Sequence, residues 1–336
     1  MSTSIGMKTQ FNKVLVIGLG QLGLPVAKYV KEKGFDTYGY DLSHEAIERA
    51  ERIAAIKKAT NFSDFDVYIV CVSTHKTDDM YSPQIDGLLS IVGTISREAK
   101  DGALVSIEST IPWGTSKGVF EMLNHRLHVV HAPHRWYSLE QEEHGVNQLR
   151  VVGGVCDCCL NEALQFYDGR NTDDATNIIN TAITNTITFN NIHSSNSNYN
   201  DNDNNEDGNK HKSLNIPMRA VSEVEIAEMT KIVENAHRYL QIAFAEDLYL
   251  YCQANNISFP ELRDALNTKW NVEVLEPREG IGGHCLPKDT RMFLQSSARR
   301  KSKILTAAME VDEDYRSYRA KIEPQLEYPL IEANSK

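Results

Sequence analysis

The chain has 336 residues, of which 41% are hydrophobic and 24% charged, and its formal net charge is −11. This composition is typical of a globular protein with room for two domains, and the negative charge argues against a protein that tracks nucleic-acid phosphates. No apolar stretch reaches the length of a membrane span, and the polar residues 1–12 lack the apolar core of a secretory signal, so we expect a cytoplasmic protein that does not enter a membrane.

The first 170 residues alternate short apolar runs with helical patterns. Helices are expected at 22–33, closed by Gly34, and after the N-cap residue Ser43. Buried strands are expected at 13–18, 37–40, 66–72, 103–107, 128–131 and 150–152. This alternation predicts an α/β fold with a doubly wound parallel sheet of the Rossmann type.

The remainder of the chain is expected to form a mostly helical second domain. Apolar residues recur at helical spacing from Glu223 to about Ala254, which predicts one long central helix, and further helices are expected near Pro260 and from Lys303 to about Tyr318. Residues 171–213 are polar and rich in Asn, which predicts a disordered insertion. The predicted domains are therefore a dinucleotide-binding domain over 1–170 and a helical domain over 214–336.

A Gly-x-Gly-x-x-Gly pattern joins the first predicted strand to the first helix. Glycines at Gly18, Gly20 and Gly23 would close the turn, admit a pyrophosphate and let the helix pack on the strand, while the helix N-terminus favours phosphate. Asp41 ends the second strand where a carboxylate would bind ribose hydroxyls and favour NAD over NADP. The alternative is a tight strand-to-helix turn without a cofactor.

A second group of residues suggests nucleophilic chemistry. Cys285 lies among glycines and a histidine and is followed by Lys288 and Asp289, and nearby cations would favour its thiolate. Considered alone, it could instead be a small buried hydrophobic residue. Lys231 and Asn235 are four residues apart on the predicted long helix and share one face, although Lys231 could equally be a solvated surface lysine.

Five motifs, which follow one another along the chain in the family's order, resemble the UDP-glucose/GDP-mannose dehydrogenase family. The likeness is strongest to its UDP-N-acetylmannosamine and UDP-glucose members. The motifs lie at 18–25, 70–74, 108–115, 231–235 and 282–289, and the resemblance spans Lys13 to Leu294 with a break at the Asn-rich segment. It implies a four-electron oxidation of a nucleotide-sugar C6 alcohol to the uronic acid with two NAD, a role in polysaccharide biosynthesis, and a homodimer formed through the long central helix.

The resemblance also assigns roles to individual residues. Cys285 would form the thiohemiacetal and thioester, Lys231 and Asn235 would stabilise the oxyanion, and Asp289 and Thr110 would position a water. The implied cofactor contacts are Gly18, Gly20, Gln21, Leu22, Gly23, Asp41, Thr74, Thr110 and Lys288, and the implied substrate contacts are His134, Lys231, Asn235 and Gly282.

Two features depart from the family pattern. His134 stands where the family has a glutamate that assists thioester hydrolysis, which puts the second oxidation in question. The chain ends at Lys336 without the third, UDP-binding domain expected after Asp289. Two alternatives therefore stay open: a two-electron dehydrogenase of a smaller hydroxy acid, against which Cys285 argues, and a non-catalytic NAD-binding partner subunit.

The six cysteines follow no disulfide framework and are expected to be reduced thiols. Three of them lie in the segment Cys156-Asp-Cys-Cys159, which contains a Cys-x-x-Cys pattern. Structural zinc needs about four ligands, and the sequence shows no second Cys/His pair at a convincing spacing. We therefore predict that this segment begins a helix and that the chain has no metal site.

Overall fold

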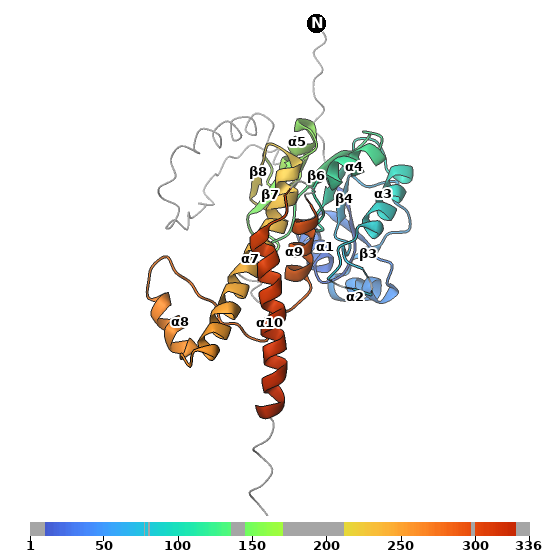
Figure 1. Ribbon diagram of the computed structural model, residues 1–336. Helices are drawn as coiled ribbons and strands as arrows, with labels where there is room; N and C mark the ends of the chain where they lie inside the picture. The colour runs from blue at the N-terminus through green and yellow to red at the C-terminus, as the bar shows by residue number, and fades with distance from the viewer. Residues whose placement is uncertain are drawn as a thin grey trace, which may run out of the picture. The chain divides into compact units, whose positions relative to one another are not determined.

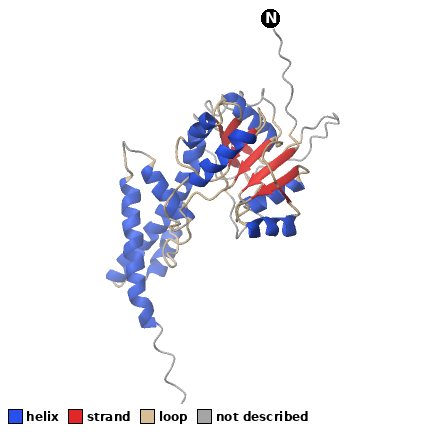
Figure 2. Cartoon of the chain, turned by 90° about the vertical axis from the view of Figure 1, so that its right-hand side faces the viewer, coloured by secondary structure: helices blue, strands red, loops and turns tan. Residues whose placement is uncertain are grey.

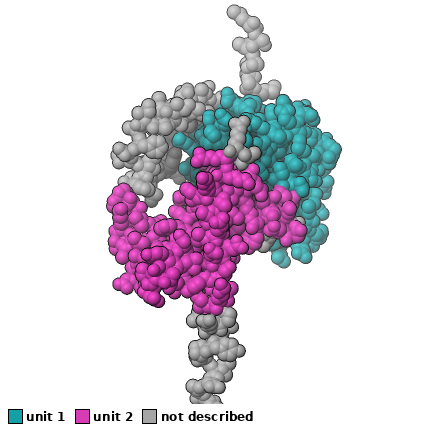
Figure 3. Space-filling model, in the orientation of Figure 1, with its two compact units in different colours: residues 1–74, 85–228 teal, residues 75–84, 229–336 magenta. Residues whose placement is uncertain are grey.

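The computed structural model describes residues 11–76, 78–79, 81–135, 145–170, 212–296 and 300–326. The chain forms two compact units, coloured separately in Figure 3: unit 1 comprises Met1–Thr74 and Ile85–Glu228, and unit 2 comprises His75–Gln84 and Met229–Lys336. Almost all of the Asn-rich segment predicted to be disordered lies outside the described residues. Among the described helices, none combines the length and apolar character needed to cross a membrane.

Unit 1 is built on one sheet whose described strands run in the order β3-β2-β1-β4-β5-β6-β7-β8 (Figure 1). Their bounds are β1 (Lys13–Ile17), β2 (Asp36–Tyr40), β3 (Lys57–Lys58), β4 (Val67–Val70), β5 (Leu104–Ile107), β6 (His128–His131), β7 (Arg150–Gly154) and β8 (Met218–Ala220). The part from β3 to β6 is parallel and has the strand order of a Rossmann fold, which confirms the predicted fold class. The prediction of a parallel sheet was wrong at one place, because β7 runs antiparallel to β6.

Helices cover both faces of this sheet, as Figure 2 shows. In β1, Val14 and Val16 point into one core, and Leu15 and Ile17 point into the other. The first core is closed by α1 (Gly23–Glu32), α2 (His44–Ala54) and α5 (Asp157–Tyr167), and the second by α3 (Asp86–Glu98) and α4 (Thr115–Met122). Burial on both faces explains why the strands are continuous apolar runs instead of alternating patterns.

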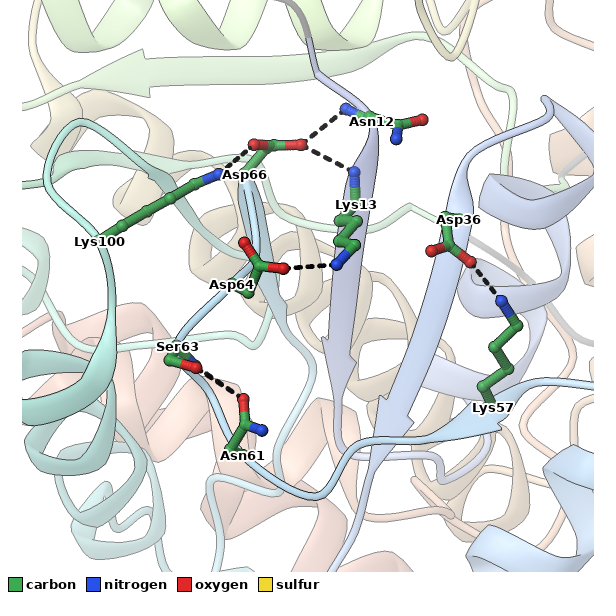
Figure 4. Close-up of polar contacts among 9 residues, drawn as sticks. All are labelled: Asn12, Lys13, Asp36, Lys57, Asn61, Ser63, Asp64, Asp66 and Lys100. Atoms are coloured by element: carbon green, nitrogen blue, oxygen red, sulfur yellow. Dashed lines mark hydrogen bonds and ion pairs between the residues drawn. The ribbon is translucent and has the colours of Figure 1, made fainter.

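One aspartate aligns the first residues of β1 and β4 (Figure 4). Asp66 precedes β4, and one of its carboxylate oxygens accepts hydrogen bonds from the backbone amides of Asn12 and Lys13, each at 2.8 Å. Its other oxygen pairs with the Lys100 ammonium at 2.6 Å. These bonds hold the two strands in register at their amino ends, so their carboxyl ends meet at the opposite edge, where the glycine loop begins.

Two predicted helix-end signals are confirmed. The Ser43 hydroxyl accepts a hydrogen bond from the Ala46 amide at 3.2 Å and caps α2. Gly34, which follows α1, has a φ of +86°, a conformation that favours glycine and ends the helix.

The long central helix predicted from the sequence is α7 (Val224–Ala254), whose residues after Glu228 belong to unit 2. Unit 2 also contains α8 (Phe259–Asn267), α9 (Cys285–Gln295) and α10 (Lys303–Leu326), and α10 continues beyond the predicted end near Tyr318. Two clusters of its buried hydrophobic residues are Tyr239, Ala243, Ile281 and Ala308, and Ala245, Cys252, Phe259 and Val274.

The boundary between the units differs from the predicted domain boundary at 214. Residues 218–220 form β8, which pairs with β7 and so extends the sheet of unit 1. The segment His75–Gln84, by contrast, interrupts unit 1 in the sequence but belongs to unit 2.

Candidate active site

The three glycines of the loop after β1 differ in why they must be glycine. A Cβ at Gly18 would lie 2.6 Å from the Cys71 carbonyl oxygen, and one at Gly23 would lie 1.7 Å from the Gly18 carbonyl oxygen, so internal packing excludes any larger residue. A Cβ at Gly20 would meet no atom within 4 Å. The space beside Gly20 is therefore open to another molecule, as expected where backbone approaches a pyrophosphate.

Asp41 is held beside this loop at the carboxyl end of β2. One carboxylate oxygen accepts from the Leu19 amide at 2.7 Å, and the other accepts from the Ser43 amide at 2.8 Å. Each oxygen keeps a further lone pair, so the carboxylate can still accept from ribose hydroxyls. Gln21 is exposed and Leu22 half-buried just before α1, where backbone amides are available to phosphate. These residues fit a bound dinucleotide.

Two further predicted cofactor residues follow neighbouring strands at the same edge of the sheet. Thr74 is buried after β4, and Thr110 is half-buried after β5. The Ser109 hydroxyl donates to the Val72 carbonyl at 2.7 Å and ties the two loops together. Thr74 and Thr110 therefore lie on the side of unit 1 where strands present ligand-binding loops.

Unit 2 brings together the other predicted catalytic residues. The Asn235 side-chain amide on α7 donates to one oxygen of Asp289 at 2.5 Å, and the Lys288 ammonium pairs with the other oxygen. Lys288 and Asp289 are buried, whereas Lys231, one turn from Asn235, is half-buried. The Asp289 carboxylate is thus fixed between an amide and an ammonium.

Cys285 is the first residue of α9 and is exposed. Its pKa is raised above the ordinary value, chiefly by desolvation and then by the Asp289 charge, while Lys288 and Lys231 oppose the rise. The nearby cations do favour the thiolate, as predicted, but desolvation and the Asp289 charge outweigh them. A thiol whose pKa is raised in this way would need a base in order to act as a nucleophile.

Two histidines, to which the sequence pattern assigned no role, lie near this cysteine. The Nε2 atom of His284 is 3.6 Å from the Cys285 sulfur, within reach of a hydrogen bond to sulfur. The His75 ring, from the segment that joins unit 2, packs edge-on against His284 with ring centroids 5.1 Å apart. The position of His284 next to Cys285 was a usable signal, but nothing near His75 in the sequence pointed to this contact.

The backbone that precedes Cys285 is supported by α10. Asp312 accepts a hydrogen bond from the Ile281 amide at 2.9 Å, and Arg316 donates to the Ile281 carbonyl and pairs with Asp312 at 3.0 Å. Gly280 and Gly283 adopt φ values of +93° and +70°, which favour glycine. At Gly282, a predicted substrate contact, a Cβ would meet no atom within 4 Å, so this position is open like Gly20.

His134 belongs to a buried ion-pair cluster in unit 1. Its Nε2 atom hydrogen-bonds the Glu108 carboxylate, which also accepts from the Tyr167 hydroxyl and lies 3.2 Å from the Arg150 guanidinium. Burial alone would raise the pKa of Glu108, but the charges of His134 and Arg150 outweigh it and hold the pKa at about 2. The Nε2 atom of His134 is thus engaged by Glu108. The contact of His134 with substrate stays a prediction.

The structure thus divides the predicted site residues between the two units. Unit 1 holds the glycine loop, Asp41, Thr74, Thr110 and His134, and unit 2 holds Lys231, Asn235, Gly282, Cys285, Lys288 and Asp289. The fold and the glycine loop define a Rossmann-type NAD-binding protein. More particularly, the chain belongs to the UDP-glucose/GDP-mannose dehydrogenase family: the family's NAD binding domain matches residues 49–169 and its central domain matches residues 225–314.

Known proteins similar to this chain include sugar-nucleotide dehydrogenases. The UDP-N-acetyl-D-mannosamine dehydrogenase of Methanococcus maripaludis is 25% identical over 328 residues, and the match covers 91% of this chain and 66% of that protein. The chain therefore spans about two thirds of the length of this curated relative.

Solved structures share the fold. The UDP-D-ManNAc dehydrogenase of Pyrococcus horikoshii matches with a TM-score of 0.69 at 24% identity, over 93% of this chain and 71% of that chain. The 3-hydroxyisobutyrate dehydrogenase of Mycobacterium tuberculosis matches with a TM-score of 0.62 at 13% identity, over 93% of this chain and 94% of that chain. At these identities the likeness concerns the fold alone.

Proposed function

We propose that this protein is an NAD-dependent dehydrogenase that oxidises the C6 alcohol of a nucleotide sugar to the uronic acid through a covalent bond to Cys285. The observation that carries the proposal is the cluster in unit 2, where an exposed cysteine begins a helix whose next turn presents Lys288 and Asp289, with Asn235 bonded to Asp289. The names of the relatives favour UDP-N-acetylmannosamine as the substrate.

The covalent steps are assigned to Cys285 and its neighbour. NAD, when bound, accepts the hydride in each of the two oxidations. The first oxidation converts the C6 alcohol to an aldehyde, and the hydroxyl proton passes to solvent. The Cys285 sulfur then adds to the aldehyde carbon to form a thiohemiacetal anion, and His284 takes the thiol proton. Oxidation of the thiohemiacetal gives a thioester, and water then cleaves the carbon–sulfur bond to release the carboxylate and restore the thiol.

The oxygen charge that develops in these steps is assigned to Lys231 and Asn235. The amide of Asn235 carries two N–H donors, of which Asp289 uses one, so the other remains for the oxyanion. Lys231 supplies the positive charge. On the family resemblance, Asp289 and Thr110 position the hydrolytic water, Lys288 lies by the cofactor, and His134 and Gly282 contact the substrate.

A homodimer formed through α7 is part of this proposal. Val233, Phe244 and Tyr251 are 42%, 59% and 59% exposed, and their spacing of eleven and seven residues places them on one face of the helix. A second copy of the chain would bury this apolar face.

Phe244→Glu should convert a dimer to a monomer in analytical ultracentrifugation, whereas Ile304→Glu, an equally drastic change at an exposed position of α10, should not. A dimer that survives Phe244→Glu would contradict this interface.

The cytoplasm is the proposed location, since all six cysteines are free thiols as expected in a reducing compartment.

The dehydrogenase proposal is tested by NADH absorbance with NAD and a panel of UDP- and GDP-sugars. UDP-N-acetylmannosamine should give NADH, and Cys285→Ser should lose this activity, whereas Cys252→Ala, which changes a buried cysteine outside the cluster, should keep it. NAD binding without NADH from any sugar nucleotide would refute the proposal and favour a non-catalytic partner subunit.

A two-electron dehydrogenase of a small hydroxy acid is the second candidate. It is suggested by the name of one structural neighbour, the 3-hydroxyisobutyrate dehydrogenase, whose fold this chain shares. NADH formation from a 3-hydroxy acid at a rate unaffected by Cys285→Ser would establish this alternative, because a simple alcohol oxidation needs no covalent intermediate.

A further inference from the structure

Sulfur and imidazole side chains gather at the start of α5, in unit 1 and outside the candidate active site. Cys156 is the N-cap of α5, and Cys158 and Cys159 lie in its first turn, while His128 is the first residue of β6. One ligand atom from each of His128, Cys158 and Cys159 lies within 4.8 Å of the other two. The sulfur of Cys156 is 3.1 Å from that of Cys159. Three metal-ligating side chains from two elements thus converge on one point, with a fourth, Cys156, in contact with one of them.

The cluster combines an anchored inner side with an accessible outer side. Cys159 is buried, and its sulfur accepts a hydrogen bond from the Val129 backbone amide at 3.3 Å, which fixes its direction. His128 is half-buried and Cys158 is exposed, so an ion can enter from solvent. The N-terminus of α5 adds a partial positive charge that favours thiolate ligands.

We propose that His128, Cys158 and Cys159 bind a thiophilic divalent cation of the Zn²⁺ class, with Cys156 beside them as a further sulfur donor. Zinc is held by cysteine sulfur at about 2.3 Å and histidine nitrogen at about 2.0–2.1 Å, so tetrahedral ligand atoms are about 3.3–3.8 Å apart. The three ligand atoms lie within 4.8 Å of one another, so they must move about 1 Å closer together to bind zinc. Rotamer adjustment of Cys158 and His128 can supply this change.

The ligand types decide which cation is expected. Mg²⁺ and Ca²⁺ require oxygen ligands, whereas sulfur with imidazole suits zinc and its soft neighbours. Binding exchanges protons for metal, because each thiol that coordinates releases one proton to the solvent. The bound ion would join the start of α5 to the start of β6. The sequence did not predict this site, because it has no second Cys/His pair at a convincing spacing, whereas the structure supplies a single histidine from a separate strand.

The test uses the full chain, kept reduced and stripped of metal with a chelator, and then titrated with Zn²⁺ in competition with a chromophoric chelator. We expect one Zn²⁺ per chain and a loss of affinity of at least about tenfold in both Cys158→Ser and His128→Ala. Cobalt added in place of zinc should give the charge-transfer band of a thiolate ligand, and this band should weaken in Cys158→Ser. Circular dichroism confirms that each variant is folded, and Cys158 is suitable because its side chain is exposed.

Two controls separate this site from adventitious binding. Cys285→Ser removes the other exposed cysteine, which has its own neighbouring histidine, and His44→Ala removes an exposed histidine with no sulfur in its described contacts. Neither change should alter zinc affinity. The proposal is overturned if the reduced chain takes up no stoichiometric zinc, or if Cys285→Ser weakens binding as much as Cys158→Ser does.

Discussion

The side-chain amide of Asn235 donates a hydrogen bond to the carboxylate of Asp289 and so joins the long helix α7 to the helix that Cys285 begins. This bond orients the Asn235 amide, and it holds Asp289 together with the buried ammonium of Lys288. The three side chains therefore form one hydrogen-bonded group near Cys285.

Asn235→Ala removes both the bond to Asp289 and the donor proposed for the oxyanion. We expect kcat to fall on the order of 100-fold with little change in KM, because the lost interaction strengthens in the transition state. Steady-state kinetics with NAD and the sugar nucleotide measure this. Arg238→Ala, at an exposed position of the same helix, is the control and should leave kcat unchanged. An unaltered kcat in Asn235→Ala would remove this residue from the oxyanion site.

Gly20→Ala distinguishes a glycine needed for NAD from one needed for folding. The added methyl meets no protein atom within 4 Å, so the free energy of unfolding should stay within about 1 kcal/mol of the parent. The Kd for NAD should rise about tenfold or more, since the methyl occupies space that the pyrophosphate needs. Gly87→Ala, an equally open glycine in the first turn of α3, should change neither quantity. Equal NAD affinity in Gly20→Ala and the parent would contradict the proposed cofactor site, and isothermal titration calorimetry decides it.

Glu108→Gln breaks a buried ion pair, whereas Glu121→Gln breaks an exposed one. Removing the Glu108 charge leaves Arg150, which is 1% exposed, without its compensating carboxylate. We expect a loss of about 3–5 kcal/mol in the free energy of unfolding by urea. Glu121 pairs with His125 at 2.8 Å but its side chain is 72% exposed, so Glu121→Gln should cost less than about 1 kcal/mol. Similar losses in the two variants would show that the buried cluster contributes no more than a surface pair.

Glu246 should make the stability of unit 2 depend on pH. Burial, followed by the charge of Asp312, raises the pKa of Glu246 to about 8 against the opposing effect of Arg316. Neither carboxylate oxygen has a hydrogen-bond partner among the described residues. The ionisable groups that interact with it are Tyr239 on its own helix and Asp312, Tyr315 and Arg316 on α10.

The sign follows from proton uptake. The unfolded chain loses the Glu246 proton near pH 4.5, whereas the folded chain keeps it up to about pH 8. Stability therefore falls between these two values as pH rises, by at most about 1.4 kcal/mol per pH unit. Glu246→Gln should flatten this dependence and be more stable relative to the parent at pH 8 than at pH 5. Asp247→Asn, the exposed neighbour, should follow the parent. Urea unfolding at both pH values measures this, and a variant that keeps the full dependence would assign it to another group.

The sequence could predict the elements that repeat a local physical pattern. The strands of unit 1 are apolar on both faces because helices cover both, and the glycine loop is recognisable because Gly18 and Gly23 have no room for a side chain. The long helix and the cysteine loop were equally visible.

Features that depend on tertiary partners could not be predicted in the same way. The direction of β7 depends on a short pairing with β6 that no local residue encodes. The raised pKa of Cys285 depends on desolvation in the folded chain and then on the Asp289 charge, and the support of Ile281 depends on Asp312 from α10. In the same way, the convergence of His128 on the cysteines of α5 appears only in the folded chain.

The central claim, that Cys285 carries the substrate covalently, is tested most directly by mass spectrometry of the Cys285 peptide. The protein is mixed with excess NAD and UDP-N-acetylmannosamine and quenched with acid during turnover. We expect an acyl adduct of the oxidised sugar nucleotide on Cys285 that is absent without NAD, and no NADH from Cys285→Ser. NADH formed by Cys285→Ser at the parent's rate, with no adduct on the parent enzyme, would contradict it.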